Sequence, residues 1–386
     1  MSFQPADRVS SFGTTIFAEI GKLASEYDAL RLSTGYPDYD GPPEAIEAAA
    51  QAMRAGHNQY APTLGEPILR EALAEHAQRF YGQQLDPEIE IAVTNGAAET
   101  LYSVCAGLIN PGDEVIIIEP HFDVYVPDVL MVGGIPRYVP LRPPHWEFDL
   151  DELESAFNAR TRAIIVNTPH NPTGKVFGRT LLEKIAALCQ KWNVIAIADE
   201  VYEHLVYSGA THIRLATLPG MFERTITISS ASKTFSFTGW RIGWALGPSH
   251  LITALRLAHQ YIIDCSATPM QYGIAAALRL PNSYFDQYVN AYSARRTLLM
   301  DALRNSGLQA LAPEGGYFIL AGIEALGFDD DVEFCRYLIR EVGVATIPPS
   351  ASFSAGNRHL GQKYIRFAFC KTLELLEQAG KRLLAL

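Results

Sequence analysis

Two residues that could carry carbonyl and acid–base chemistry each follow a short apolar run of the chain. Lys233 comes shortly after Thr227-Ile228, and Asp199 comes directly after Ala196-Ile197-Ala198. A lysine can form a Schiff base with an aldehyde if burial and a cationic neighbour, such as Arg241, lower its pKa. A carboxylate such as Asp199 can pair with a protonated ring nitrogen and keep it charged. Together these residues favour a planar heteroaromatic cofactor.

Further groups at predicted strand ends suit the other parts of such a cofactor. The segment Asn95-Gly96-Ala97-Ala98 opens a predicted helix. The free N–H groups and positive dipole end of a helix N-terminus can bind a phosphate. Its two alanines have no side-chain donor, so only their N–H groups could serve. Asn171 and Tyr202 could donate hydrogen bonds to a ring hydroxyl oxygen, and Phe122 could stack on the ring.

Each of these residues, taken alone, has an ordinary structural interpretation. A strand-end aspartate such as Asp199 is more often a helix cap. Lys233, after Ser-Ala-Ser, would more often be a solvated surface residue, and Asn171-Pro172 is a common turn. Chance would seldom place all of them in order at successive strand ends, so their joint pattern favours a ligand site.

The elements that must position these residues alternate between apolar runs and helical stretches from about residue 45 to residue 280. Continuous apolar strands separated by helices indicate a mostly parallel sheet that is covered on both faces. Ligands bind at the carboxyl ends of the strands in such a sheet. The predicted strands are 89–94, 114–119, 136–141, 163–167, 194–198 and 225–228, and the clearest helices are 97–109 and 181–192.

The two ends of the chain differ from this pattern and predict a smaller α+β lobe. Its expected elements are a helix over 284–304, a strand over 316–320, a helix over 331–342, a strand over 364–369 and a terminal helix. The predicted fold class is therefore α/β, with a large domain over 45–280. The turn-rich residues 1–44 and the segment 281–386 would together form the small domain.

Composition excludes several classes of protein. With 386 residues, 48% of them hydrophobic and 19% charged, the chain is an ordinary globular protein, long enough for two domains. Its net charge of −11 argues against a nucleic-acid partner. No apolar run approaches the ~20 residues of a membrane span, and no signal peptide is visible. Five scattered cysteines without a CxxC pair predict neither disulfides nor a metal site, as in a cytoplasmic protein.

Three motifs resemble those of class I/II aminotransferases. They are Asn-Thr-Pro-His-Asn-Pro-Thr-Gly-Lys at 167–175, Asp-Glu-Val-Tyr at 199–202, and Ser-Ala-Ser-Lys-Thr-Phe-Ser-Phe-Thr-Gly-Trp-Arg-Ile-Gly at 230–243. The resemblance runs from about residue 15 to the C-terminus. It implies the aspartate aminotransferase fold, which is fold type I of the pyridoxal 5′-phosphate (PLP) enzymes, and PLP as the cofactor.

Shorter segments are similar to the kynurenine, glutamine and methionine aminotransferases within that family. They are Thr15-Ile16-Phe17, Gly35-Tyr36-Pro37-Asp38, Asn58-Gln59-Tyr60 and Glu119-Pro120-His121-Phe122-Asp123. The succinyldiaminopimelate aminotransferases share most of these motifs.

The resemblance implies a role for each matching residue around the cofactor ring. Lys233 would bind PLP covalently and move the proton between the substrate's α carbon and the cofactor. Asp199 would hold the proton of the pyridine nitrogen. Tyr202 and Asn171 would bind the phenolic oxygen, and Phe122 would stack on the ring.

The resemblance also implies a phosphate site and a substrate site. The phosphate would be bound by the backbone of Ala97 and Ala98, by Ser230 and Arg241, and by Tyr60 of the partner subunit in a homodimer. Arg366, helped by Asn171 and the Gly35 backbone, would bind the substrate α-carboxylate. Relatives often carry a side-chain donor or an aromatic residue where this chain has Ala97 and Ala98. That departure concerns the affinity for the cofactor rather than its identity.

These features predict an aminotransferase that moves an amino group between an α-amino acid and a 2-oxo acid in two half-reactions. A PLP-dependent β-lyase of the same fold would share the cofactor site, but its substrate's amino group would leave as ammonia. A PLP-like domain in a transcription regulator would need a DNA-binding module, for which about 44 turn-rich residues are too few. A Rossmann dehydrogenase would need a GxGxxG motif after the first strand, and none is present.

Side-chain selectivity is expected from an aromatic pocket. Its predicted lining is Phe12, Ile16, Phe17, Tyr36, Phe122, Tyr125 and Tyr261, with Asp38 and Asp123 as the nearest charges. Without a second cation, this pocket predicts uncharged, sizeable side chains, namely methionine, aromatic, glutamine or kynurenine types. Aspartate would be poor because its second carboxylate would be buried unpaired. The alternative is that these aromatics only pack the domain junction; an arginine entering from elsewhere would favour a succinyldiaminopimelate-type substrate.

Overall fold

An eight-stranded sheet lies at the centre of the computed structural model, which describes residues 4–10, 12–13 and 15–386. Its strands are β2 (Ile91–Thr94), β3 (Glu114–Glu119), β4 (Ile135–Arg142), β5 (Glu147–Phe148), β6 (Thr161–Asn167), β7 (Ile195–Asp199), β8 (Thr225–Ser230) and β9 (Gly243–Leu246). Their order across the sheet is β2-β9-β8-β7-β6-β3-β4-β5. The run β8-β7-β6-β3-β4 is parallel, whereas β9 is antiparallel to both of its neighbours. The predicted, mostly parallel α/β sheet is confirmed.

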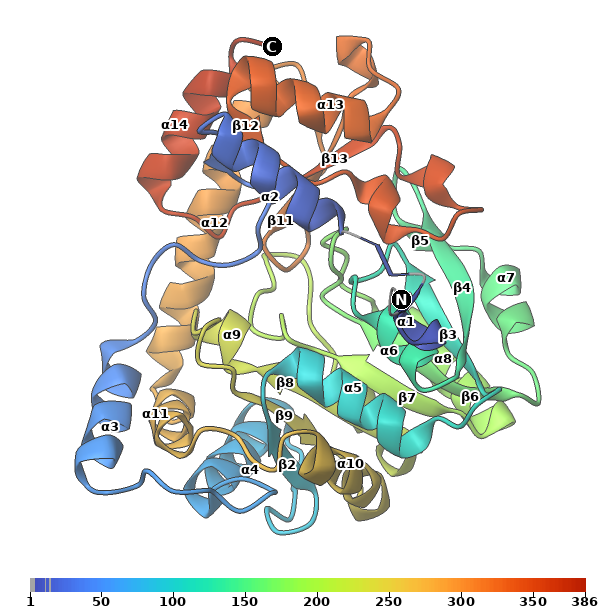
Figure 1. Cartoon of the computed structure of the whole chain (residues 1–386), viewed down its shortest axis with the longest axis vertical. Coiled ribbons are helices and arrows are strands. Elements are labelled where there is room, and N and C mark those ends of the chain that lie inside the picture. Colours follow the sequence, from blue (N-terminus) through green and yellow to red (C-terminus); the bar gives the residue numbers. More distant parts are fainter. Residues whose placement is uncertain (1–3, 11, 14) are drawn as a thin grey trace.

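The apolar strands are buried on both faces because successive side chains point to opposite sides of a strand. Ile164 and Val166 belong to the core on one face, whereas Ala163 and Ile165 belong to the core on the other. The first core includes helices α7 (Leu150–Ala156) and α8 (Arg179–Trp192), and the second includes α5 (Ala97–Leu108), α6 (Tyr125–Met131) and α10 (Ser249–Ile262). Further helices pack beside β2 and β9 (Figure 1), namely α3 (Pro43–Arg54), α4 (Pro67–Tyr81) and α11 (Thr268–Leu278).

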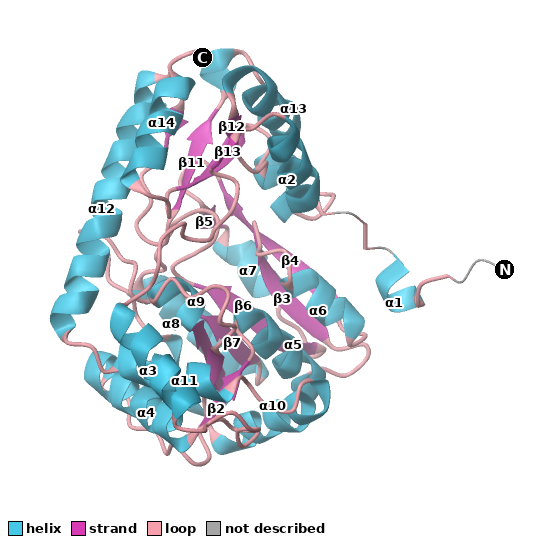
Figure 2. Cartoon of the chain, turned by 60° about the vertical axis from the view of Figure 1, so that its left-hand side comes forward, coloured by secondary structure: helices cyan, strands magenta, loops and turns pink. Residues whose placement is uncertain are grey.

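A second, three-stranded antiparallel sheet lies above the central one in Figure 2. It contains β10 (Gln309–Ala310), β11 (Phe318–Gly322) and β13 (Tyr364–Ala368). The helices around it are α12 (Asn282–Asn305), α13 (Asp331–Tyr337), which continues into a π-helical turn at Leu338–Val342, and α14 (Leu373–Leu383). The expected helices and strands after residue 281 are therefore present, with ends shifted by a few residues.

The N-terminal segment packs against this C-terminal part of the chain. Strand β1 (Leu30–Arg31) pairs in parallel with β12 (Val344–Ala345). Helix α2 (Ile16–Glu26) contributes Ile20 to a buried cluster that also contains Phe334 and Phe367. These contacts join segments more than 300 residues apart in sequence, as the prediction of a lobe built from both ends requires. The domain boundaries themselves, at 44/45 and 280/281, stay a prediction.

The remaining helices are short. They are α1 (Asp7–Ser10), α9 (Ala231–Thr234) and 3-10 turns at Leu215–Thr217, Phe222–Arg224, Glu324–Leu326, Pro349–Ser352 and Arg358–Leu360. None of the helices in the described part of the chain is long and apolar enough to cross a membrane.

Candidate active site

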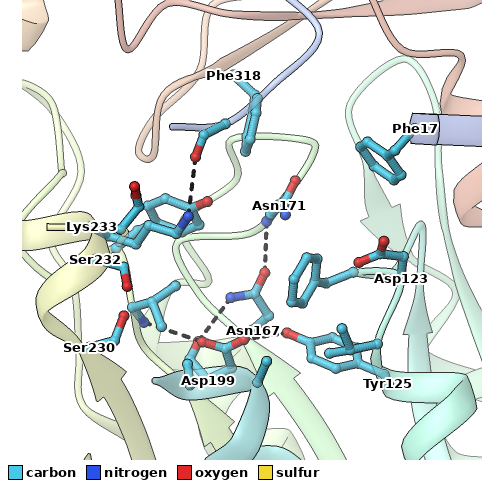
Figure 3. Close-up of a pocket in the computed structure, with 18 of the residues that line it drawn as sticks. Phe17, Asp123, Tyr125, Asn167, Asn171, Asp199, Ser230, Ser232, Lys233 and Phe318 are labelled. Carbon is cyan, nitrogen blue, oxygen red and sulfur yellow. Dashed lines mark hydrogen bonds between the residues drawn. The ribbon is translucent and has the colours of Figure 1, made fainter. Parts of the chain in front are cut away.

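A cavity of about 410 Å³ opens where the parallel strands of the large sheet end (Figure 3). The predicted site residues that line it are Gly35, Ala97, Ala98, Phe122, Asn171, Asp199, Tyr202, Ser230, Lys233, Arg241 and Arg366. Tyr60 does not: its side chain is 86% exposed, beside a separate surface depression lined by Asn58 and Cys265. The fold therefore brings together every residue predicted to bind the cofactor or the substrate α-carboxylate, except Tyr60, which is assigned to a partner subunit.

The sheet topology explains why Arg241 reaches this edge. Strand β9 runs opposite to its neighbours, so its first residue lies where β2 and β8 end. Gly243 pairs with Thr94 on one side and with Ser230 on the other. Arg241, two residues earlier, is thereby placed beside the start of α5. The sequence did not predict β9, because only four apolar residues form it.

Backbone N–H groups and one guanidinium converge at this end of the cavity. Helix α5 starts after Gly96 without a side-chain cap, which leaves its first N–H groups without intrahelical partners. Gly96 has φ +81°, and a Cβ atom there would lie 2.3 Å from Nη2 of Arg241. Arg241 is held by the carbonyl of Thr238 at 3.0 Å and by that of Asn95 at 3.4 Å. Free N–H groups beside a fixed cation suit a phosphate dianion.

Lys233 lies on the short helix α9, immediately after strand β8. Its Nζ donates a hydrogen bond to the carbonyl of Gly35 at 3.2 Å, which ties the N-terminal segment to the cavity. Burial lowers the pKa of Lys233, and the positive charges of Arg241 and Arg366 lower it further, whereas Asp199 opposes them. A lowered pKa increases the fraction of neutral amine that can act as a nucleophile or base.

Asp199 is held at the cavity floor by groups from two other elements. The Tyr125 hydroxyl donates to its Oδ2 at 2.6 Å, and the backbone N–H of Val201 donates to its Oδ1 at 3.3 Å. The Asn167 side chain donates to the carbonyl of Asp199 at 2.9 Å and accepts from the N–H of Asn171 at 2.7 Å. Burial raises the pKa of Asp199, which the Tyr125 bond and Lys233 partly offset. A desolvated carboxylate fixed in this way can bind a cationic N–H.

The loop after β7, which carries Tyr202, is anchored by a buried ion-pair network. Arg214 contacts Glu203 at 2.5 Å and Glu200 at 3.2 Å, and all three side chains are almost completely buried. Tyr202 is buried against the edge of the Tyr317 ring, with ring centroids 5.0 Å apart. This packing fixes the orientation of the Tyr202 phenol beside the cavity.

Arg366 comes from β13, opposite the large sheet. Its Nη2 donates to the carbonyl of Ser33 at 2.9 Å, and its Nη1 lies 3.4 Å from Oδ1 of Asn171. The guanidinium stacks over Phe318 at 4.3 Å. Its Nε is buried without a hydrogen-bond partner among the described residues. A buried, unpaired N–H on a cation in a cavity is a site for an anion such as a carboxylate.

Sequence reasoning missed several residues of this site. Asn167 and Tyr125 were not recognised as partners of Asp199, and Ser232, Thr238 and Phe318 also line the cavity. Two features of the sequence could have indicated them: Asn167 is an amide at the end of an apolar strand, and Tyr125 is an aromatic residue three positions after Phe122.

Three of the aromatic residues predicted for the substrate pocket line the cavity: Phe17, Phe122 and Tyr125. The others, Phe12, Ile16, Tyr36 and Tyr261, are not part of its described lining. Tyr261 is 84% exposed, and Tyr36 lies under the ammonium group of Lys371 at 4.2 Å. Four of the seven residues predicted for this lining thus lie outside the described cavity, whereas Tyr202 and Phe318 add aromatic rings to it.

The donor set in the cavity fits a phosphorylated pyridine aldehyde. The phosphate would meet Arg241 and the start of α5, the ring nitrogen would meet Asp199, and the aldehyde carbon would meet the amine of Lys233. The phosphate needs a cationic partner, the protonated ring nitrogen an anionic one, and the aldehyde a neutral amine. The lining residues include a suitable partner for each of these three groups of PLP.

Comparisons with known proteins agree with this geometry. The sequence pattern of the family "Aminotransferase class I and II" matches residues 27–383. The solved structure of N-succinyldiaminopimelate aminotransferase from Mycobacterium tuberculosis is 43% identical, with a TM-score of 0.96 over 99% of both chains. That of YbdL from Escherichia coli, described as having a methionine aminotransferase function, is 37% identical, with a TM-score of 0.95 over 100% of both chains. Kynurenine–oxoglutarate transaminase of Dictyostelium discoideum is 38% identical over 100% of this chain and 97% of its own.

The chain therefore belongs to the class I and II aminotransferases. It has the aspartate aminotransferase fold and is a PLP-dependent aminotransferase, as the sequence motifs predicted.

Proposed function

We propose that the protein catalyses transamination and that each residue around the cavity has the role that the motifs predict for it. PLP supplies an electron sink for the negative charge that develops at the substrate α carbon. Lys233 holds the cofactor covalently and then, as a free amine, moves the proton at the α carbon. The single observation that supports this assignment is the placement of the Lys233 amine, Asp199 and Arg366 around one cavity.

Asp199 keeps the ring nitrogen protonated, and Tyr125 and Asn167 hold Asp199 in place. Tyr202 and Asn171 bind the phenolic oxygen, and Phe122 packs on the ring face. Together these residues would hold the ring beside the amine of Lys233, which would move the proton. Arg366, with Asn171 and the Gly35 segment, orients the substrate through its α-carboxylate.

The phosphate is bound by the N–H groups of Ala97 and Ala98, by Ser230 and Arg241, and by Tyr60 of the partner subunit. A homodimer with shared sites is supported by the position of Tyr60, which is exposed and outside the cavity of its own chain. We also propose a cytoplasmic location, which fits a chain with five cysteines and no predicted disulfide.

Mixed dimers test the shared site. Lys233→Ala and Tyr60→Phe each impair one half of it, so each variant alone should be weakly active or inactive. Mixing them should restore activity, because a heterodimer contains one complete site with Lys233 from one chain and Tyr60 from the other. Sedimentation checks that a dimer is present, and activity that does not recover on mixing would contradict the shared site.

The amino donor has an uncharged, sizeable side chain of the methionine, aromatic, glutamine or kynurenine type. The supporting observation concerns the positively charged side chains in the described cavity lining, which are Lys233, Arg241 and Arg366. All three have proposed partners in the cofactor or the α-carboxylate, so none is left for a second carboxylate. Burying that carboxylate unpaired costs several kcal/mol.

The alternative is a succinyldiaminopimelate-type substrate, which the similarity to the Mycobacterium tuberculosis enzyme favours. The measurement is kcat/KM for methionine and phenylalanine against aspartate and succinyldiaminopimelate. A preference for either acidic substrate would refute the assignment to uncharged side chains. Release of ammonia in place of amino transfer to a 2-oxo acid would instead indicate the β-lyase reaction.

A further inference from the structure

Asp123 is a carboxylate in the cavity that none of the proposed steps uses. It directly follows Phe122, lines the same cavity, and is accessible from it. Figure 3 places Asp123 and Phe17 on the side of the pocket opposite Lys233. The amine that reacts and this carboxylate therefore lie at different ends of the space that a substrate would occupy.

The charge of Asp123 has no close partner among the described residues. Arg366 and His121 attract it electrostatically, but neither forms an ion pair with it within 4.0 Å. Partial burial against the cavity wall raises the pKa of its carboxyl, although the residue as a whole is exposed to solvent. Its own backbone N–H contacts the carboxylate, and the remaining lone pairs of that group can accept from a ligand that carries an N–H group.

We propose that Asp123 determines substrate specificity by accepting a hydrogen bond from an N–H group at the far end of the substrate side chain. The inference rests on the proposed function, because Arg366 must hold the α-carboxylate for the side chain to point toward Asp123. The substrate class is an α-amino acid whose side chain ends in an N–H donor, such as a carboxamide or an aromatic amine. Phe17 would cover the apolar part of that side chain.

The same carboxylate would reject side chains that end in an acid. A distal carboxylate would face the negative charge of Asp123, and like charges placed together across a binding site repel each other. Glutamine and glutamate have nearly the same shape, so they differ mainly in this interaction. The proposal thus predicts discrimination between an amide and an acid of equal size.

Unreactive ligands separate binding from turnover. Glutarate and glutaramate are glutamate and glutamine without the amino group, so they cannot be transaminated, and hexanoate is an apolar reference. Their dissociation constants are measured by calorimetry with the holoenzyme, the Asp123→Asn variant and the Asp40→Asn control. Asp40 is an exposed acid outside the cavity lining, so its substitution makes the same change in net charge.

We expect the wild-type protein and the Asp40→Asn control to bind glutaramate on the order of tenfold or more tightly than glutarate. In Asp123→Asn the preference should fall to within about threefold, chiefly because glutarate binds better. An unchanged preference, or equal weakening of all three ligands, would overturn the proposal.

Kinetics distinguish this result from failure of the proposed function. The ratio of kcat/KM for glutamine to that for glutamate should shrink in Asp123→Asn in parallel with the binding ratio. A wild-type enzyme that turns over neither methionine nor glutamine would refute the proposed substrate class. The preference for glutaramate over glutarate would still report on Asp123 in that case.

Discussion

Acid should weaken the contact between α4 and the loop that carries Tyr202. His76, on α4, and His204, in that loop, meet through their Nε2 atoms at 2.8 Å, with Phe80 and Phe285 packed around them. Burial lowers the pKa of His76 from 6.5 to about 3 and that of His204 to about 4. Both rings are therefore neutral in the folded protein, and one donates its Nε2–H to the other.

The sign of the effect follows from these values. The folded pKa lies below the unfolded one, so the unfolded chain binds more protons between about pH 3 and pH 6.5. The stability is fully present above pH 6.5 and is lost as the pH falls. When the pH falls from 7.5 to 5.0, the free energy of unfolding should decrease by about 2 kcal/mol for each histidine. The decrease is roughly 1.4 kcal/mol for each pH unit below 6.5.

Urea unfolding of the holoenzyme at the two pH values measures this loss. The His76→Gln variant should lose about 2 kcal/mol less than the wild-type protein on acidification, because one of the two titrations is gone. The exposed His145 provides the matched control, and His145→Gln should lose as much as the wild type. Equal losses in all three proteins would refute the assignment of two neutral histidines at this contact.

Three further substitutions test the site. Lys233→Ala should abolish transamination and the absorbance band of covalently held cofactor while PLP can still bind; near-wild-type turnover would exclude its catalytic role. Gly96→Ala should raise the dissociation constant of PLP by about tenfold, because positive φ and contact with Arg241 strain the phosphate site; equilibrium dialysis measures it, and unchanged affinity would contradict this geometry. Arg214→Leu should destabilise the fold by about 3–5 kcal/mol by leaving two buried carboxylates unpaired, and a wild-type urea midpoint would argue against the network.

The strand-end residues could be predicted because their signal is local. A polar residue that interrupts an apolar run, such as Asp199, marks the end of a buried strand whatever the rest of the fold. The parallel order of the strands then places those ends along one edge. Arg366 was different: nothing in its own segment indicates a ligand, and only the resemblance to aminotransferases singled it out.

The contacts that position the site could not be predicted in the same way. Tyr125 reaches Asp199 across 74 positions of sequence, and this contact depends on how α6 packs on the sheet. Some aromatic residues predicted for the lining lie outside the cavity for a related reason. Tyr36 and Tyr261 belong to segments that were expected to lie near the site. The direction in which each side chain points, however, is set by tertiary packing.

The charge distribution of the cavity shows why whole-chain composition says little about this ligand. The chain carries a net charge of −11, yet its cavity is lined by Lys233, Arg241 and Arg366 against Asp123 and Asp199. Arg366 is buried, whereas Arg241 is exposed. After burial itself, the positive charges of both arginines contribute to the lowered pKa of Lys233. A phosphate at Arg241 and a carboxylate at Arg366 would offset those charges. The local excess of positive charge thus favours a phosphate and a carboxylate as ligands, while burial, the largest cause of the lowered pKa of Lys233, continues to favour its neutral amine.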